Sequence, residues 1–280
     1  MFVKIENMEL LGYAASILIG ISLGLIGSGG SILTVPVLVY LFSIDPLLAT
    51  SYSLCIVGVS SIAGVISRLR QKLLDLKIIV LFGAPSILGV FIARKFILHA
   101  IPDQFSLLPN TLISKSGFIM LFFATLMFAS ALSMILGKST KEIPGQKPEY
   151  GISLALVGLV EGMVTGIVGA GGGFLIIPAL VILGKLPMKR AIASSLFIIT
   201  VKSLVGFGGD LMHLNIAWSA PLNEMILSIK FLLTIIILAT LGIITGNYLN
   251  KKMDGAKLKK GFGWFVLGMS FVIIIEQFFI

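Results

Sequence analysis

Two glycine clusters stand inside apolar stretches of the chain, where glycine is costly to a helix by about 1 kcal/mol relative to alanine. The first cluster is Gly27, Ser28, Gly29, Gly30 and Ser31, and the second is Gly169, Ala170, Gly171, Gly172 and Gly173. We expect each cluster to break a helix. The free N–H groups and the positive dipole end of the resumed helix then favour an anion.

The alternative is that these small residues let helices pack closely, as in GxxxG pairs. Gly20 and Gly24, and likewise Gly162 and Gly166, have that spacing. We assign the packing role to these pairs and the anion site to the two clusters. Unwound backbone inside a bilayer is tolerated only where protein covers it or where it lines an aqueous cavity, which favours the site.

Hydroxyl side chains follow each cluster at the expected start of the next helix: Thr50, Ser51 and Ser53, and then Ser194 and Ser195. They can cap the N–H groups of that helix. They can also meet the glycine breaks and complete two facing cradles for an oxyanion. The sequence leaves both interpretations open.

Two ionisable residues lie within apolar stretches, where such residues are functional hypotheses by default. Glu161 lies about ten residues into one expected helix and Lys202 about twelve residues into the next, so their side chains can meet near the middle of the membrane. They can form a structural ion pair. Alternatively, Lys202 attracts the anion while Glu161 titrates with a coupled proton. We place Asp210, His213 and Glu224 on a solvated external rim.

The elements that would hold these residues are membrane-spanning helices. The chain has 280 residues, 57% hydrophobic and 12% charged, whereas soluble domains are about 25% charged. A span needs about twenty apolar residues, and candidate stretches cover residues 10–27, 49–67, 78–97, 117–136, 151–168, 191–208, 225–249 and 261–279. This composition excludes a soluble domain.

The remaining composition narrows the function. The net charge of +9 comes from short loops between apolar stretches, where basic residues orient the spans, so we expect no nucleic-acid partner. Cys55 is the one cysteine, which excludes an intrachain disulfide and a cysteine metal cluster. We expect no cofactor and no metal. No nucleophile–base pair stands out, so we expect no enzyme.

The chain is an internal duplication. Residues 20–64 align without a gap on residues 162–206, and 17 of the 45 positions are identical. Self-similarity at a fixed separation indicates a repeat. We therefore divide the chain into an N-terminal transmembrane repeat over 1–140, a linker over 141–150 and a C-terminal transmembrane repeat over 151–280.

Loop charges predict that the repeats are inverted. The basic loop 68–77 corresponds to 209–221, which has no Lys or Arg, whereas the acidic loop 44–48 corresponds to 186–190, which is basic. Homologous loops therefore face opposite sides by the positive-inside rule. We expect an all-α integral membrane protein with two inverted repeats of four hydrophobic segments. The first segment of each is two half-helices, and both termini lie outside the cytoplasm.

The doubled motif resembles the TauE/SafE family of membrane anion permeases, also called sulfite exporters. Each copy has four glycines, a proline, a leucine and then a small-residue cluster: Gly24, Gly27, Gly29, Gly30, Pro36, Leu38, Ala49, Ser53 and Leu54, and again Gly166, Gly169, Gly171, Gly172, Pro178, Leu180, Ala191, Ser195 and Leu196. The resemblance implies transport of sulfite, a sulfonate or another organic anion across the cytoplasmic membrane. Ser31, Tyr52 and Lys202 depart from the usual pattern.

We expect a secondary transporter that moves a small anion by alternating access. The rival hypotheses are an anion channel, a carrier of a non-sulfur organic anion and, more remotely, an intramembrane enzyme. The partners expected are the anionic substrate and the lipid bilayer. The sequence leaves open the identity of the anion, the direction of transport, the coupling ion and whether the chain forms a homo-oligomer.

Overall fold

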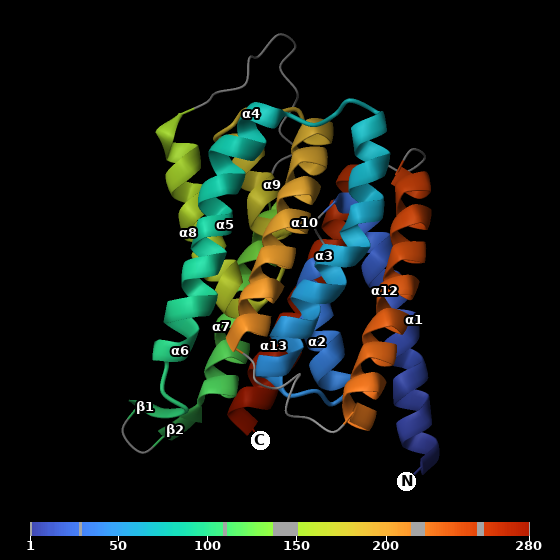
Figure 1. The fold of residues 1–280 in the computed structure, drawn as a ribbon, viewed down its shortest axis with the longest axis vertical. Coiled ribbons are helices and arrows are strands. Elements are labelled where there is room, and N and C mark those ends of the chain that lie inside the picture. The colour runs from blue at the N-terminus through green and yellow to red at the C-terminus, as the bar shows by residue number, and fades with distance from the viewer. Residues whose placement is uncertain are drawn as a thin grey trace.

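The computed structural model describes residues 2–27, 30–108, 111–136, 151–213, 222–250 and 255–279. These residues form a bundle of helices that run roughly along one direction (Figure 1). One short antiparallel hairpin, β1 (Gln104–Leu108) and β2 (Thr111–Ser114), projects from the lower edge. The all-α architecture expected from the sequence did not include this hairpin.

The described residues of the first half form four helical segments. They are the pair α1 (Phe2–Ile26) and α2 (Ser31–Tyr40), then α3 (Pro46–Arg70), a continuous helix over Leu76–Ala100 and α7 (Lys115–Leu136). The continuous helix consists of α4 (Leu76–Ile78), α5 (Ala84–Ile92) and α6 (Leu98–Ala100), joined by π-helical turns at Ile79–Gly83 and Ala93–Ile97. Pro85 in α5 explains the first π turn, because a proline ring clashes with the carbonyl four residues earlier.

The second half repeats this order. It contains the pair α8 (Ile152–Val168) and α9 (Gly173–Ile182), then α10 (Met188–His213), α12 (Leu222–Asn250) and α13 (Gly255–Phe279). In Figure 1, α1 rises from the lower edge and α2 returns to it, whereas α8 descends from the upper edge and α9 returns there. Corresponding helices of the two halves thus run in opposite directions.

Both broken helices end in the same way. Gly27 and Gly169 have positive φ angles of 80° and 70°. Their N–H groups donate to the carbonyls of Leu23 and Thr165, four residues earlier, at 2.7 and 2.9 Å. A glycine in the left-handed region that closes the last turn is a common helix stop. The breaks therefore lie where the glycine clusters predicted them.

The two halves interleave through glycine-lined seams. The first helix of each half packs along the third helix of the other half: α1 along α12, and α8 along α5. A methyl group added at Gly242 would lie 2.9 Å from the Cα of Gly20, and one added at Gly89 would lie 3.1 Å from the carbonyl carbon of Gly162. The helix backbones therefore touch. Gly20 and Gly162 do pack helices closely, as their spacing predicted.

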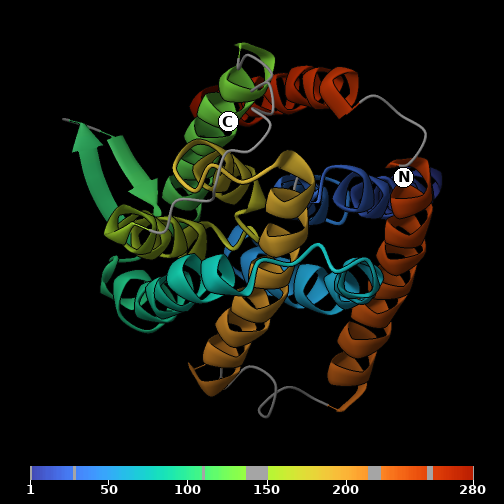
Figure 2. The same cartoon turned by 90° about the horizontal axis from the view of Figure 1, so that it is seen from above.

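The remaining helices pair with their own counterparts. α3 packs against α10, and α7 against α13, and the view from above shows the first pair in the middle and the second at one side (Figure 2). Apolar residues from both halves share one core, including Ile32, Phe123, Phe174 and Ile243. The bundle is thus a single packed unit and not two separate ones.

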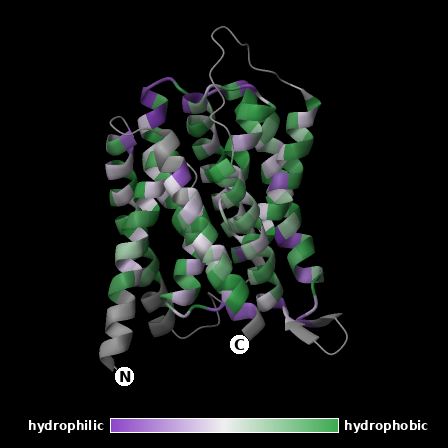
Figure 3. Cartoon of the chain, turned by 180° about the vertical axis from the view of Figure 1, so that it is seen from behind, coloured by the Kyte–Doolittle hydropathy of each residue, from purple (hydrophilic) through white to green (hydrophobic). Residues whose placement is uncertain are grey.

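The outer surface of the bundle suits a membrane. Within the described residues, five helices are long and apolar enough to cross a bilayer: Pro46–Arg70, Leu76–Ala100, Lys115–Leu136, Met188–Leu211 and Ile229–Asn250. Large apolar side chains such as Leu88, Ile237 and Trp264 are exposed. Figure 3 shows hydrophobic residues along the middle of the bundle and hydrophilic ones mostly towards its two edges. The helical membrane class predicted from composition is confirmed.

Candidate functional site

The two helix breaks approach each other inside the bundle. A methyl group added at Gly171 in the second break would lie 3.1 Å from the Cβ of Ser31, the first residue of α2. Ser31 is fully buried. The α2 N-terminus therefore meets the backbone that precedes α9. The structure brings together the two clusters that the sequence singled out.

Each break also packs on the second helix of the opposite half, and the two contacts are equivalent. A methyl group at Gly169 would lie 2.5 Å from the Cα of Thr50, and one at Gly27 would overlap the side chain of Ile192. The repeat relates Gly27 to Gly169 and Thr50 to Ile192, each by 142 positions. The contacts are therefore exchanged between the halves, as a two-fold relation requires.

Charged side chains lie directly against the second break. Lys202 Nζ donates to Glu161 Oε1 at 2.5 Å and to Thr165 Oγ1 at 3.0 Å. Ser86 Oγ on α5 donates to the other carboxylate oxygen of Glu161 at 2.7 Å. Gly172 has φ 72°, and a methyl group there would lie 2.5 Å from Lys202 Nζ. The ammonium thus lies beside backbone that only glycine fits.

Lys202 and Glu161 are both almost fully buried, with side chains 1% and 3% exposed. An ion pair this deep is expensive to desolvate, and apolar residues often replace such pairs with no loss of stability. Stability alone is therefore a weak explanation for it. Chemically, the cluster offers two groups. The fixed ammonium beside the start of α9 can attract an anion, and the carboxylate can accept a proton.

The first break has no ionisable side chain at the corresponding positions. Gly30, the counterpart of Gly172, has a helical φ of −65°, and a methyl group there would lie 2.8 Å from the Leu23 side chain. Glu161, Thr165 and Lys202 correspond to Ile19, Leu23 and Ser60. The hydroxyl of Ser60 donates to the Ile56 carbonyl of its own helix at 2.6 Å. The two breaks share the positive-φ glycine that ends the first helix, but they differ at the start of the second helix and in charge.

Side chains cap the end of α1 at the first break. Arg68 Nη2 donates to the Gly24 carbonyl at 3.3 Å and to Asn247 Oδ1 at 3.4 Å. The side-chain amide of Asn250 donates to the Leu25 carbonyl. The last carbonyls of a helix lack intrahelical partners, and these side chains donate to two of them.

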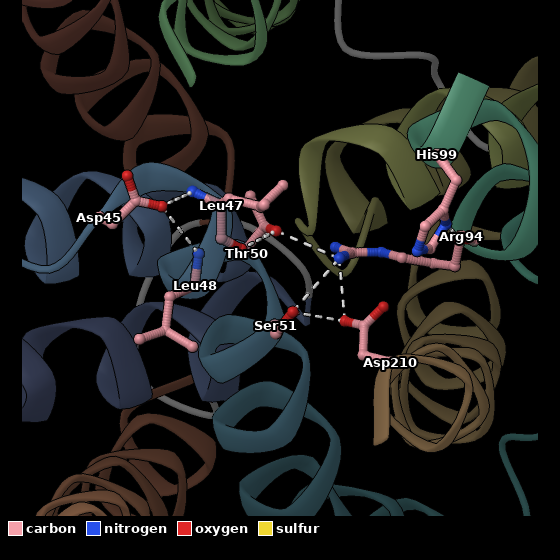
Figure 4. A network of polar contacts seen from close by, with 8 residues as sticks. All are labelled: Asp45, Leu47, Leu48, Thr50, Ser51, Arg94, His99 and Asp210. Atoms are coloured by element: carbon pink, nitrogen blue, oxygen red, sulfur yellow. Dashed lines mark hydrogen bonds and ion pairs between the residues drawn. The ribbon is translucent and has the colours of Figure 1, made fainter. Parts of the chain in front are cut away.

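A second charged cluster lies where the sequence predicted solvent (Figure 4). Arg94 Nη1 forms an ion pair with Asp210 Oδ2 at 2.9 Å, and both side chains are buried, 1% and 6% exposed. Ser51 Oγ donates to the same carboxylate oxygen at 2.6 Å. The placement of Asp210 on a solvated rim was wrong, because α10 and the helix over Leu76–Ala100 extend further than the apolar stretches indicated.

The other members of that expected rim are not described in full. The side chains of His213 and Glu224 lie outside the described residues, as do Ser28 and Gly29 of the first cluster.

The hydroxyl residues do not cap their helices. Asp45 is the N-cap of α3, and its carboxylate accepts from the N–H groups of Leu47 and Leu48 at 2.9 and 3.4 Å. Thr50 therefore lies inside α3, where its hydroxyl donates to the Leu47 carbonyl at 2.7 Å. The capping interpretation was wrong because the helix begins at Pro46, before the small residues.

Hydroxyl residues of both halves lie close to a break, because Thr50 packs on Gly169 and the Ile192 carbonyl, which accepts from Ser195, lies against Gly27. Thr50 packs on Gly169 and also accepts from Arg94 Nη1 at 3.2 Å. Ser194 accepts from the N–H of Asp75 at 3.0 Å, and Ser195 donates to the Ile192 carbonyl at 3.0 Å. These hydroxyls therefore make different contacts in the two halves. Ser53 is buried, and its hydroxyl has no partner among the described residues.

The residues that sequence reasoning missed are Arg94, Thr165 and Ser86. Arg94 lies within the candidate stretch 78–97, so the rule that flags ionisable residues inside spans could have found it. Thr165 stands four residues after Glu161 and therefore shares its helix face. Ser86 on α5 gave no local signal, because its role depends on the packing of α5 against α8.

Comparison with known proteins agrees with this picture. Residues 12–273 match the family profile of the sulfite exporter TauE/SafE. A probable membrane transporter protein of Xylella fastidiosa strain Temecula1 is 28% identical over 263 residues, covering 92% of this chain and 91% of the relative. One from Haemophilus influenzae is 28% identical over 282 residues, covering 93% and 94%.

No solved structure matches the chain significantly. The family match spans nearly the whole chain and includes both helix breaks, both charged clusters and the glycine seams. The relatives are described as membrane transporters, and the fold is a bundle of apolar helices with long candidate spans. The chain belongs to the TauE/SafE sulfite exporter family of multi-pass membrane transporters.

Proposed function

We propose that the protein is a secondary transporter that carries a small anion through a site at the two helix breaks. The observation that carries this proposal is the buried ammonium of Lys202 beside Gly172 and the start of α9. A cation and free N–H groups in one water-poor place favour negative charge. The family name supports a sulfur-containing oxyanion or organosulfonate as substrate.

We further propose that the two halves, 1–140 and 151–280, form an inverted repeat in the membrane. The opposite directions of corresponding helices and the exchanged contacts of Gly27 and Gly169 support this arrangement. Discontinuous helices in inverted repeats are a common way to build a transport site near the middle of a membrane.

The orientation proposed places both termini outside the cytoplasm. Figure 1 has α1 begin and α13 end at the lower edge, while the loops that precede α4 and α10 lie at the upper edge. Those two loops carry the basic residues counted by the positive-inside rule. A basic loop residue near the lower edge would argue against this orientation, because the rule places such residues in the cytoplasm. Arg94 is not such a residue, since it is buried in an ion pair.

Glu161 is proposed as the group that couples transport to a proton. Its carboxylate shares a site with Lys202, so protonation of Glu161 would release the ammonium for the anion. The Glu161→Gln variant should bind substrate but lose uptake or export driven by a pH gradient. Unchanged coupling in that variant would end this part of the proposal.

The first experiment is a binding screen of the purified protein against sulfite, thiosulfate, sulfonates and carboxylates. Titration calorimetry in detergent should give a saturable signal with one of these anions, and Lys202→Met should abolish it. Flux into proteoliposomes against a set gradient then separates the two transport classes. Uncoupled flux far above carrier rates would instead identify an anion channel.

A further inference from the structure

Arg94 holds two buried donors that the ion pair with Asp210 does not use. Its Nη1 atom makes the described contacts: Asp210 Oδ2 at 2.9 Å, Thr50 Oγ1 at 3.2 Å and Ser51 Oγ at 3.5 Å. Nε and Nη2 are buried and have no hydrogen-bond partner among the described residues. A buried N–H without a partner is costly, and more so on a charged group.

These two atoms form one edge of the guanidinium. Nε–H and one N–H of Nη2 point in parallel, and such a fork grips two oxygens of a carboxylate or another oxyanion. Asp210, Thr50 and Ser51 all hold the far nitrogen, Nη1. The side chain is thus fixed with its oxyanion-binding edge unoccupied by the protein groups described.

The cluster adjoins the second break. Thr50 contacts both Gly169 and Arg94 Nη1, so only one residue separates the guanidinium from the break. Figure 4 shows the Arg94 side chain extending from its own helix towards Thr50 and Ser51 of α3, with Asp210 of α10 beside them. Three different helices therefore fix this guanidinium in place.

We propose that the Nε–Nη2 edge of Arg94 is a second anion-binding position, which takes one oxyanion group of the substrate. The chemical class is a small molecule with a carboxylate, sulfonate or sulfite group able to accept two parallel hydrogen bonds. The inference rests on the proposed function in one respect, namely that the transported species is an anion.

Asp210 positions Arg94 and also opposes the ligand. Its carboxylate fixes Nη1, but its negative charge offsets that of the guanidinium, so a bound oxyanion gains chiefly from directional hydrogen bonds. Removal of that charge should therefore strengthen anion binding. If the ion pair is purely structural, Asp210→Asn should instead leave anion binding unchanged or weaker, since loss of either partner leaves the other charge buried and unpaired.

The chain offers a matched control in Arg68. The duplication relates Arg68 to Asp210 by 142 positions, and Arg94 to Asn247 by 153 positions after the loop insertion. Arg68 Nη2 is already bonded to the Gly24 carbonyl and to Asn247 Oδ1. Arg68 therefore has Nη2, one of the two atoms of its fork, engaged within the protein, near the other edge of the bundle.

The test is calorimetric titration of the purified protein with sulfite, sulfoacetate and acetate, with Arg94→Lys, Arg68→Lys, Asp210→Asn and Lys202→Met compared with wild type. Arg94→Lys keeps the charge but removes the fork, so affinity for the best anion should fall at least tenfold. Arg68→Lys should stay within twofold. Asp210→Asn should bind at least threefold more tightly.

The outcomes separate the two proposals. If wild type binds none of the anions, the proposed function fails. If wild type binds one and Lys202→Met loses it, but Arg94→Lys binds as wild type does, the Arg94 position is overturned and the proposed function stands. Should Arg94→Lys fail to fold, Asp210→Asn decides alone: unchanged or weaker binding overturns the proposal.

Discussion

The two helix breaks share a helix stop and a set of neighbours but not a chemistry. Gly27 and Gly169 have φ angles of 80° and 70°, and each packs on the residue equivalent to the other's partner. At the second break Lys202 and Glu161 form a buried ion pair, whereas Ser60 and Ile19 stand at these positions in the first. The duplication has kept the helix stop and changed the side chains that face it.

This difference indicates that the breaks do separate tasks. The first is capped by Arg68 and Asn250, whose donors satisfy the carbonyls at the end of α1. The second has charge on two sides, from Lys202 and from Arg94 across Thr50. We therefore expect substitutions at equivalent positions to have unequal effects, and each prediction below compares such positions.

The largest effect is expected from Lys202→Met. Removal of the ammonium leaves Glu161 buried and unpaired, which costs about 3–5 kcal/mol of unfolding free energy. The measurement is reversible unfolding in mixed micelles. The double variant Lys202→Met with Glu161→Leu should regain most of that stability while anion binding stays absent. A double variant that still binds the anion would refute the role of the pair.

The second-largest effect is expected from alanine at the two positive-φ glycines, and it should differ between the two breaks. Both variants bear the roughly 1–2 kcal/mol cost of a left-handed residue with a Cβ. At Gly169 the methyl also meets the backbone Cα of Thr50, whereas at Gly27 it meets the Ile192 side chain. Gly169→Ala should therefore lose about 1–3 kcal/mol more through overpacking. Equal melting temperatures in detergent would contradict this asymmetry.

A smaller effect is expected from Asn250→Ala at the first break. It removes the donor that caps the Leu25 carbonyl, which should cost about 1 kcal/mol. Because the first break carries no charge cluster, anion affinity should stay at the wild-type value. Thermal unfolding gives the first quantity and calorimetry the second. A loss of affinity as large as that of Lys202→Met would show that the Asn250 cap, and not only the backbone of the first break, supports the anion site.

The smallest effect is expected from Ser60→Ala, at the position that the duplication relates to Lys202. The Ser60 hydroxyl donates only within its own helix, so its loss should change stability by less than about 1 kcal/mol. Transport should proceed at the wild-type rate in proteoliposomes. A strongly slowed variant would mean that the position matters in both halves.

Much of the architecture could be predicted from the chain alone. Apolar stretches gave the spans, and the doubled glycine motif gave the two breaks, because both signals are local. The ends of the helices were harder to predict. Asp210 stands just after the stretch 191–208, where hydropathy falls, so the sequence predicted a solvated position for it, although pairing with Arg94 lets it stay buried.

The site was only partly predictable. Glu161 and Lys202 could be paired by their depth in two helices, and the structure places them in contact. The partners of Thr50 and Ser194 could not be foreseen, since they depend on which helix of the opposite half lies alongside. That choice follows from long-range packing of glycine seams and not from any local pattern.

The interleaved seams also bear on how the protein assembles during synthesis. Gly20 on α1 is covered by the backbone of α12 at Ala239, about 220 residues later in the chain. At roughly 5–20 residues per second, the ribosome makes that partner about 10–45 seconds after α1. Until then the glycine face of α1 is exposed to lipid. The first helix made is thus among the last to find its place.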